Sequence, residues 1–360
     1  MKLKFNSSAR KATSADFRYA AIRIGITAFS FFLLSELVPA QVAPQVSGST
    51  SASAESSDRL KPVLLTDEMG RRVKIPAEVK RVVSLAPNLT EIVFALGKGD
   101  QLAGDTDFCD YPPAATKKPH IGGPINPNFE QIAALAPDLI LATKAINRRE
   151  TVEALDRLGL PVYVTDPHSV DGMIATVERI GAALHSEESA WPLVNDLRVR
   201  LSDLDRRLAG TTTRRVLFVV WTDPLISIGR DTFIADALRH AGAQSVIVTA
   251  AEWPRINLEE VIRLQPEFIV FASSHAENTQ HDIDVLRSRP GWRDLDALRN
   301  GKIVVISDSI NRPAPRMVDA IEQLARALHA ESFTTSGAAL GTGPTTSPTQ
   351  IIEEVCACAR

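Results

Sequence analysis

An internal repeat constrains the fold of this chain more than any other feature. Two segments carry Asn, Glu, Leu and Pro at identical offsets: residues 128–141, NFEQIAALAPDLIL, and residues 257–270, NLEEVIRLQPEFIV. In each copy the Asn can cap a short helix, the Pro ends it, and the apolar run that follows suits a buried strand. A helix–strand unit repeated at this distance predicts two similar α/β lobes, with a cleft between them.

Each copy also has an acidic residue beyond those that capping requires. The N-caps and their reciprocal partners are Asn128 with Gln131 and Asn257 with Glu260. Glu130 and Glu259 remain, one at the same place in each lobe. A carboxylate in the first helical turn interacts favourably with the positive end of the helix dipole, which stabilises the helix by ~0.3–1 kcal/mol. This interaction explains both residues without a function. Alternatively, two equivalent carboxylates suit docking onto two basic sites of a symmetric partner.

The composition excludes some classes of protein. The chain has 360 residues, 44% of them hydrophobic, which is enough for two domains, and its formal net charge of −3 argues against a nucleic-acid binder. The Gly-x-Ser-x-Gly, phosphate-loop and His-Glu-x-x-His signatures of enzymes are absent from the sequence. Cys109 alone cannot hold a metal cluster, and Cys356 and Cys358 have no assigned purpose. We therefore expect a protein that is not an enzyme.

The N-terminal segment predicts export. Basic residues precede the apolar run 24–37, and small residues lead to Ala40, so residues 1–40 suit a signal peptide cleaved near Ala40. An uncleaved anchor is the alternative. No Cys follows the apolar run, which does not support a lipoprotein anchor. Residues 41–59 are rich in Ser, Ala and Gln and predict a flexible spacer. The expected location is the periplasm, or another compartment reached by export.

The remaining pattern predicts the fold class. Strands and helices alternate over residues 60–185 and again over 210–330, which indicates two Rossmann-like α/β lobes with central parallel sheets. Residues 186–209 predict one long rigid helix that joins the lobes, and residues 331–360 a disordered tail. In the second lobe we expect strands at 216–221, 245–249, 268–272 and 303–306.

Large aromatic residues follow several of the expected strands. They are Phe108, Tyr111, Trp221 and Trp253. Because ligands of open α/β sheets bind beyond the carboxyl ends of the strands, these side chains are candidates for ligand contacts. Packing beneath a loop is the other interpretation, and it is favoured for Tyr111.

Six motifs together resemble a known family. They are RVVSLAPNLTE at 81–91, DYPP at 110–113, Gly122-Gly123 with Asn128-Phe-Glu130, PDLI at 137–140, Trp253-Pro254 with Glu259, and Asp308, Arg312 and Pro315-Arg316. Over about residues 60–330 the chain resembles the periplasmic substrate-binding proteins with a helical backbone. These proteins serve ABC importers of cobalamin, ferric siderophores and haem. The motifs are closest to the cobalamin-binding branch.

The resemblance implies roles for particular residues. It implies that Glu130 and Glu259 contact arginines of an ABC permease dimer in the inner membrane. The implied ligand-binding residues are Pro87, Asn88, Phe108, Tyr111, Trp221, Trp253, Asp308 and Arg312. The transported ligand is then cobalamin or another corrinoid, with no resident cofactor or metal, and the protein is expected to be a monomer. Gly123-Pro124 stands where that branch leads us to expect a tryptophan.

Other functions stay open on the sequence. The same fold captures ferric siderophores, which need basic cleft residues, and haem, which needs an axial Tyr or His such as Tyr111, His120 or His168. An enzyme related to the two-lobed chelatases and nitrogenases would need metal-cluster cysteines or paired histidines. A tethered sensor would retain its N-terminal segment.

Overall fold

The computed structural model describes residues 61–273 and 283–334, which belong to one compact unit. The expected signal peptide, the expected spacer, His275, His281, Cys356 and Cys358 lie outside the described residues. Among the described helices, none combines the length and the apolar character needed to cross a membrane.

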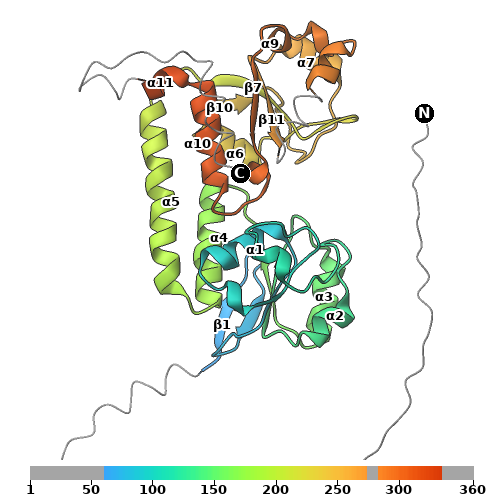
Figure 1. Cartoon of the computed structure of the whole chain (residues 1–360), viewed down its shortest axis with the longest axis vertical. Helices are drawn as coiled ribbons and strands as arrows, with labels where there is room; N and C mark the ends of the chain where they lie inside the picture. The colour runs from blue at the N-terminus through green and yellow to red at the C-terminus, as the bar shows by residue number, and fades with distance from the viewer. Residues whose placement is uncertain (1–60, 274–282, 335–360) are drawn as a thin grey trace, which may run out of the picture. The chain divides into compact units, whose positions relative to one another are not determined.

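The first lobe is built on a four-stranded parallel sheet with the strand order β4-β3-β5-β6 (Figure 1). The strands are β3 (Val82–Ser84), β4 (Leu102–Gly104), β5 (Leu139–Thr143) and β6 (Val162–Thr165). An antiparallel hairpin of β1 (Val63–Thr66) and β2 (Arg72–Ile75) precedes them, as the alternating sequence predicts. Each strand after β3 pairs in parallel with a neighbour, so the crossovers must be helical or long.

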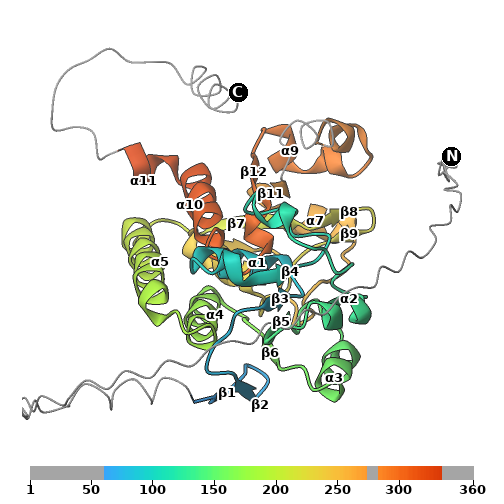
Figure 2. The same cartoon turned by 60° about the horizontal axis from the view of Figure 1, so that its bottom comes forward.

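Helices bury both faces of this sheet. Leu139 and Leu141 of β5 belong to one apolar cluster, whereas Ile140 and Ala142 belong to another, because successive side chains point to opposite faces. The first face packs against α1 (Pro87–Ala95) and α4 (Val170–Ala183), and the second against α2 (Phe129–Ala134) and α3 (Arg149–Arg157). Figure 2 shows α4 and α3 on opposite sides of the strands. Burial on both faces explains the uninterrupted apolar runs of the sequence.

The second lobe repeats the arrangement with the strand order β10-β7-β11-β12. The strands are β7 (Arg214–Val219), β10 (Ala243–Ser245), β11 (Phe268–Ser273) and β12 (Ile303–Ser307). One face packs against α6 (Phe233–His240) and α10 (Met317–Leu328), and the other against α7 (Leu258–Leu264), η4 (Trp292–Asp294) and α9 (Asp296–Arg299). In both lobes the repeated segment forms a short helix and the third strand in chain order. The predicted α/β fold of two similar lobes is therefore confirmed.

A long helix, α5 (Glu187–Leu208), joins the lobes. Its 22 residues correspond to about 33 Å at 1.5 Å per residue. Its buried stripe is Ala190, Val194, Leu197, Leu201, Leu204 and Leu208. Figure 1 shows α4 beside it, and Arg200 of α5 forms ion pairs with Asp319 and Glu322 of α10. A single apolar cluster includes residues of β3 and β5 in the first lobe, of α5, and of β7 and α10 in the second.

Two segments differ from the sequence-based expectations. The strand expected at 245–249 is wrong, because β10 ends at Ser245, whose hydroxyl accepts a hydrogen bond from the N–H of Ile247 and turns the chain away. The first four residues of the expected tail are helical, within α11 (Ala330–Thr334). Phe333 of α11 lies under the guanidinium groups of Arg207 and Arg326, at 5.1 and 5.6 Å from the ring centre, which holds this end against α5 and α10.

Candidate functional site

The carboxyl ends of the strands in the two lobes supply the candidate site. In each sheet the first strand, β3 or β7, lies between the second and the third, so the strand order reverses beside it. Ligands of open α/β sheets bind outside the carboxyl ends at this reversal point. Pro87 follows β3, Trp221 follows β7, and Asp308 follows β12 directly. The strand order thus brings the predicted residues to the expected edge of each sheet.

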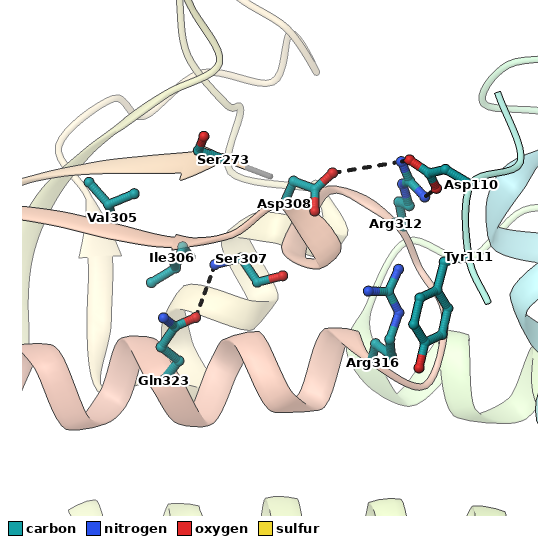
Figure 3. A pocket seen from close by; sticks show the side chains of 10 residues that line it. All are labelled: Asp110, Tyr111, Ser273, Val305, Ile306, Ser307, Asp308, Arg312, Arg316 and Gln323. Atoms are coloured by element: carbon teal, nitrogen blue, oxygen red, sulfur yellow. Dashed lines mark hydrogen bonds and ion pairs between the residues drawn. The ribbon is translucent and has the colours of Figure 1, made fainter. Parts of the chain in front are cut away.

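A pocket of about 510 Å³ is lined by three of the predicted ligand-binding residues (Figure 3). They are Tyr111, Asp308 and Arg312, and Asp110 of the matched motif DYPP lines the pocket as well. Arg316, Ser307 and Gln323 also line it. Asp110 and Tyr111 come from the loop after β4, and the remainder come from the second lobe, so the pocket has walls from both lobes.

Five charged residues connect the lobes beside this pocket. This interlobe ion cluster consists of Glu91 and Asp110 from the first lobe and Asp308, Arg312 and Arg316 from the second. Arg316 donates from Nε and Nη2 to the two oxygens of Glu91 at 2.9 and 2.7 Å. Arg312 donates to the two oxygens of Asp110 at 2.5 and 3.0 Å, and lies 3.3 Å from Glu91.

The interlobe ion cluster has more carboxylates than guanidinium groups. Three carboxylates face two guanidinium groups, and the hydrogen bonds above use Nη1 and Nη2 of Arg312 and Nε and Nη2 of Arg316. The hydrogen bonds from Arg312 lower the pKa of Asp110 below its ordinary value. The side chains of Asp110 and Asp308 are partly exposed, so the pocket offers carboxylate oxygens to hydrogen-bond donors.

Tyr111 is held by stacking as well as by its position in the loop. The guanidinium carbon of Arg316 lies 3.5 Å from the centre of the Tyr111 ring, as Figure 3 shows. The ring still lines the pocket, with 40% of the residue exposed. Tyr111 therefore packs against Arg316, and it also faces the pocket. Its contact with a ligand stays a prediction.

Three aromatic residues are unusually exposed near the same sheet edges. Phe108, Trp221 and Trp253 are 62%, 60% and 46% exposed. Trp221 opens β8 (Trp221–Thr222), which pairs with β9 (Leu225–Ile226), and Ile226 bridges to Arg255, so Trp221 and Trp253 lie on neighbouring segments. None of the three lines the 510 Å³ pocket.

Glycine at position 123 gives room to one of these rings. A Cβ at Gly123 would lie 3.7 Å from Cε2 of Phe108, which is ordinary van der Waals contact. The ring of Phe108 therefore lies beside the position where a tryptophan was expected.

Pro87 and Asn88 are less accessible than the sequence suggested. Pro87 is half-buried at the first position of α1, and Asn88 is 2% exposed. Both side-chain polar atoms of Asn88 are buried without a hydrogen-bond partner among the described residues. Neither residue lines the 510 Å³ pocket, so the structure does not bring them together with Asp308 and Arg312.

The two repeated glutamates occupy equivalent, exposed positions. Glu130 and Glu259 are each the second residue of their helix, α2 and α7, and within the described part of the chain neither side chain forms an ion pair or hydrogen bond. The predicted caps are confirmed, since Asn128 accepts from the N–H of Gln131 and Asn257 from that of Glu259. The predicted reciprocal bond of the first copy, in which Gln131 accepts from the N–H of Asn128, is wrong. The N–H of Asn128 donates to the carbonyl of Ile121 instead.

The other candidate groups are bound to neighbours. His120 Nδ1 lies 2.9 Å from Asp105, and His168 Nε2 lies 3.2 Å from Asp166. Cys109 is buried, with its sulfur 3.2 Å from the hydroxyls of Thr90 and Thr106, and burial raises the pKa of its thiol. Across residues 61–273 and 283–334 no group of three or more His, Cys, Asp or Glu side chains could hold a metal ion.

Sequence reasoning missed two charged residues that the structure places at the site, Glu91 and Arg316, and a third, Lys144, at the carboxyl edge of the first-lobe sheet. Glu91 and Arg316 belong to matched motifs, but neither was assigned a role. Glu91 ends one motif and Arg316 ends another, and their opposite charges were the signal that could have suggested a contact. Lys144 follows β5 directly, at the carboxyl end of a buried strand. Its position could have been recognised by the rule that drew attention to Trp221.

Comparison with known proteins gives a matching family, a similar relative and two similar solved structures. The sequence profile of a family described as periplasmic binding protein matches residues 82–309. The vitamin B12-binding protein of Vibrio parahaemolyticus is 31% identical over 246 residues, which are 68% of this chain and 87% of the relative.

Two solved structures share the fold over nearly their whole length. The periplasmic vitamin B12 binding protein of Vibrio cholerae has a TM-score of 0.62 and 27% identity, covering 71% of this chain and 99% of that protein. The periplasmic haem-binding protein of Roseiflexus sp. RS-1, in its apo form, has a TM-score of 0.62 and 28% identity, covering 70% and 99%.

Proposed function

This chain belongs to the periplasmic binding protein family, among substrate-binding proteins of ABC transporters, and from that premise we propose that it captures cobalamin or a related corrinoid. The ligand binds between the lobes, and the protein delivers it to an ABC permease. Export to the periplasm is part of the proposal, with the N-terminal segment as its signal. The permease contacts the exposed Glu130 and Glu259, one on each lobe.

The observation that supports a corrinoid is the charge balance of the interlobe ion cluster. A carboxylate ligand would be repelled by the three acidic side chains that already surround Arg312 and Arg316. The primary amides on the rim of a corrin ring are hydrogen-bond donors, and the partly exposed carboxylates of Asp110 and Asp308 can accept from them. The exposed rings of Phe108, Trp221 and Trp253 supply apolar area for the macrocycle.

Capture of haem or a ferric siderophore is the second candidate, supported by the likeness to the haem-binding protein. Haem would require an axial ligand, and Tyr111 is the pocket residue of the right kind, but its ring is stacked against Arg316. His120 and His168 are each bound to a carboxylate. Haem propionates and siderophore carboxylates would also meet the acidic surplus of the interlobe ion cluster.

Calorimetric titration of the purified chain with cyanocobalamin, haemin and a ferric siderophore in parallel tests the proposal. One-to-one binding of cyanocobalamin alone is the expected result. Trp253→Ala and Phe108→Ala should each weaken it at least tenfold, while Trp191→Ala, which removes an exposed tryptophan on the joining helix α5, should not. Binding of haemin or the siderophore without cyanocobalamin would overturn the ligand and leave the family assignment intact.

A further inference from the structure

Tyr111 and Arg316 are the two residues that line both of two neighbouring cavities. One is the 510 Å³ pocket, and the other has a volume of about 220 Å³. The other residues of the smaller cavity are apolar apart from one buried carboxylate. They are Phe94, Ala95, Pro112 and Pro315, with Glu91 as the carboxylate. Tyr111 thus borders open space in two directions, so packing against its neighbours does not by itself fix its side chain.

A stack with Arg316 orients the ring of Tyr111. The guanidinium carbon of Arg316 lies 3.5 Å from the ring centre, and Figure 3 shows the two planar groups side by side. In the part of the chain that the structure describes, the hydroxyl of Tyr111 has no hydrogen-bond partner. The stack is therefore the directional contact that this side chain makes.

Arg316 is itself held at both ends. Its Nε and Nη2 donate to the two oxygens of Glu91 at 2.9 and 2.7 Å, and such a two-point contact fixes the plane of the guanidinium group. Its backbone stands at the N-cap of α10, where its carbonyl accepts from the hydroxyl of Ser309 at 3.2 Å and from the N–H of Ala320 at 3.3 Å. The side chain that supports the ring therefore has little freedom of its own.

This support crosses from one lobe to the other. Glu91 and Tyr111 belong to the first lobe, and the guanidinium group of Arg316, from the second lobe, contacts both. Arg312 makes a different contact, because it donates to the carboxylate of Asp110. The position of a first-lobe wall of the pocket is therefore set by a second-lobe side chain.

We propose that Arg316 is a positioning residue for the ligand, which acts by holding the ring of Tyr111 against the pocket. The inference rests on the proposed function and adds to it a source of affinity that needs no contact between Arg316 and the ligand. A ring that is already oriented loses little freedom when a flat macrocycle packs against it. A ring free to turn towards the smaller cavity must be ordered during binding, which lowers the affinity about two- to tenfold.

The test measures the affinity for cyanocobalamin by calorimetric titration. Arg316→Lys keeps a positive charge opposite Glu91 but has no planar group to stack on the ring. In the parent background it should weaken binding about fivefold. In a Tyr111→Phe background, which keeps a ring, the same loss should recur. In a Tyr111→Ala background, which lacks the ring, the change should be less than about twofold, because Arg316 then has nothing to position.

Arg207→Lys is a matched control, since Arg207 also stacks on an aromatic ring, that of Phe333 at 5.1 Å, and neither residue lines the two cavities. It should bind cyanocobalamin as the parent does, and thermal melting without ligand checks that each variant is folded. An equal loss with and without the ring of Tyr111, or no loss from Arg316→Lys, would overturn the positioning role while the proposed function stands. A parent protein that does not bind cyanocobalamin would overturn the proposed ligand and this role together.

Discussion

Glu91 accepts hydrogen bonds from two arginines of the other lobe while its own side chain is 2% exposed. A carboxylate buried this deeply is tolerated only with good partners, and the arginines in turn depend on it. Glu91 therefore contributes both to the stability of the chain and to the contact between its lobes.

Replacing this carboxylate should be costly. Glu91→Gln leaves Arg316 and Arg312 partly uncompensated, and we expect the free energy of unfolding to fall by about 2 kcal/mol, less than for a fully buried pair because both arginines are partly exposed. Urea unfolding followed by circular dichroism measures this. Glu78→Gln, which breaks an exposed pair, should leave the midpoint unchanged. Equal effects of the two changes would contradict the argument.

Asp105 should make the stability depend on pH. Burial raises its pKa to about 6 despite the hydrogen bond with His120. The unfolded chain has the ordinary value, 3.8, so the folded state favours the protonated acid, and this contribution is present below pH 4 and lost as the pH rises to 6. Asp105→Asn should therefore gain stability relative to the parent between pH 4 and pH 6, by roughly 2 kcal/mol. Urea unfolding across this range measures the difference, and a constant difference would refute the assignment.

At the scale of elements, the repeated segment shows how short helices are specified. The helices α2 and α7 have six and seven residues, so their intrinsic stability is small and their caps matter. Asn128 and Asn257 each accept a first-turn N–H, which fixes where the helix begins and where the glutamate that follows is presented.

Removing the caps should act on each lobe separately. Asn128→Ala and Asn257→Ala should each cost about 1 kcal/mol, and the double variant about the sum, because the caps share no partner. Asn128→Asp keeps the acceptor oxygen and should cost less. Thermal melting monitored by circular dichroism gives the comparison. A double variant much less stable than the sum would show that the two helices are coupled.

The sequence predicted elements well where one pattern decided them. The caps, the stop at proline and the apolar run predicted α2 with β5 and α7 with β11, because each signal is local. The prediction of a strand at 245–249 failed since the apolar residues Val246 and Ile247 are buried in a loop, where the hydroxyl of Ser245 accepts a hydrogen bond from the N–H of Ile247 at the end of the strand. Periodicity reports burial, and it cannot distinguish a buried loop from a strand.

At the scale of the whole molecule, the two lobes present equivalent acidic positions. Glu130 and Glu259 are exposed, are second in their helices, and precede the third strand of the same strand order. A partner with twofold symmetry could contact both in the same way.

Reversing these charges should separate binding from transport. Glu130→Lys with Glu259→Lys should leave the affinity for the ligand unchanged, because neither side chain lines the described pockets, and should abolish uptake in cells that depend on this protein. Glu260→Lys, next to Glu259 and equally exposed, is the control and should transport normally. Loss of affinity in the double variant would reject the docking role.

Contacts between residues distant in the sequence account for what could not be predicted of the site. The motifs pointed to Asp308 and Arg312, but their partners Glu91 and Asp110 are about two hundred residues earlier in the chain, and no local pattern pairs them. The resemblance implied that Asn88 binds the ligand, yet packing of α1 buries its side chain. Which group of a motif faces the ligand is decided by the packing of the lobes, which the linear pattern does not contain.

The apolar cluster that runs through both lobes has a consequence for the rate of ligand capture. Sliding one lobe against the other would expose part of that cluster to water, at about 25 cal/mol for each Å². We therefore expect the empty protein to keep one arrangement of its lobes, so that the apparent affinity is not lowered by molecules unable to bind. Association of the ligand is then a simple second-order reaction. The time that a ligand stays bound depends only on its contacts in the cleft. We then expect release to require a transporter that weakens those contacts directly, because no opening of the lobes would precede it.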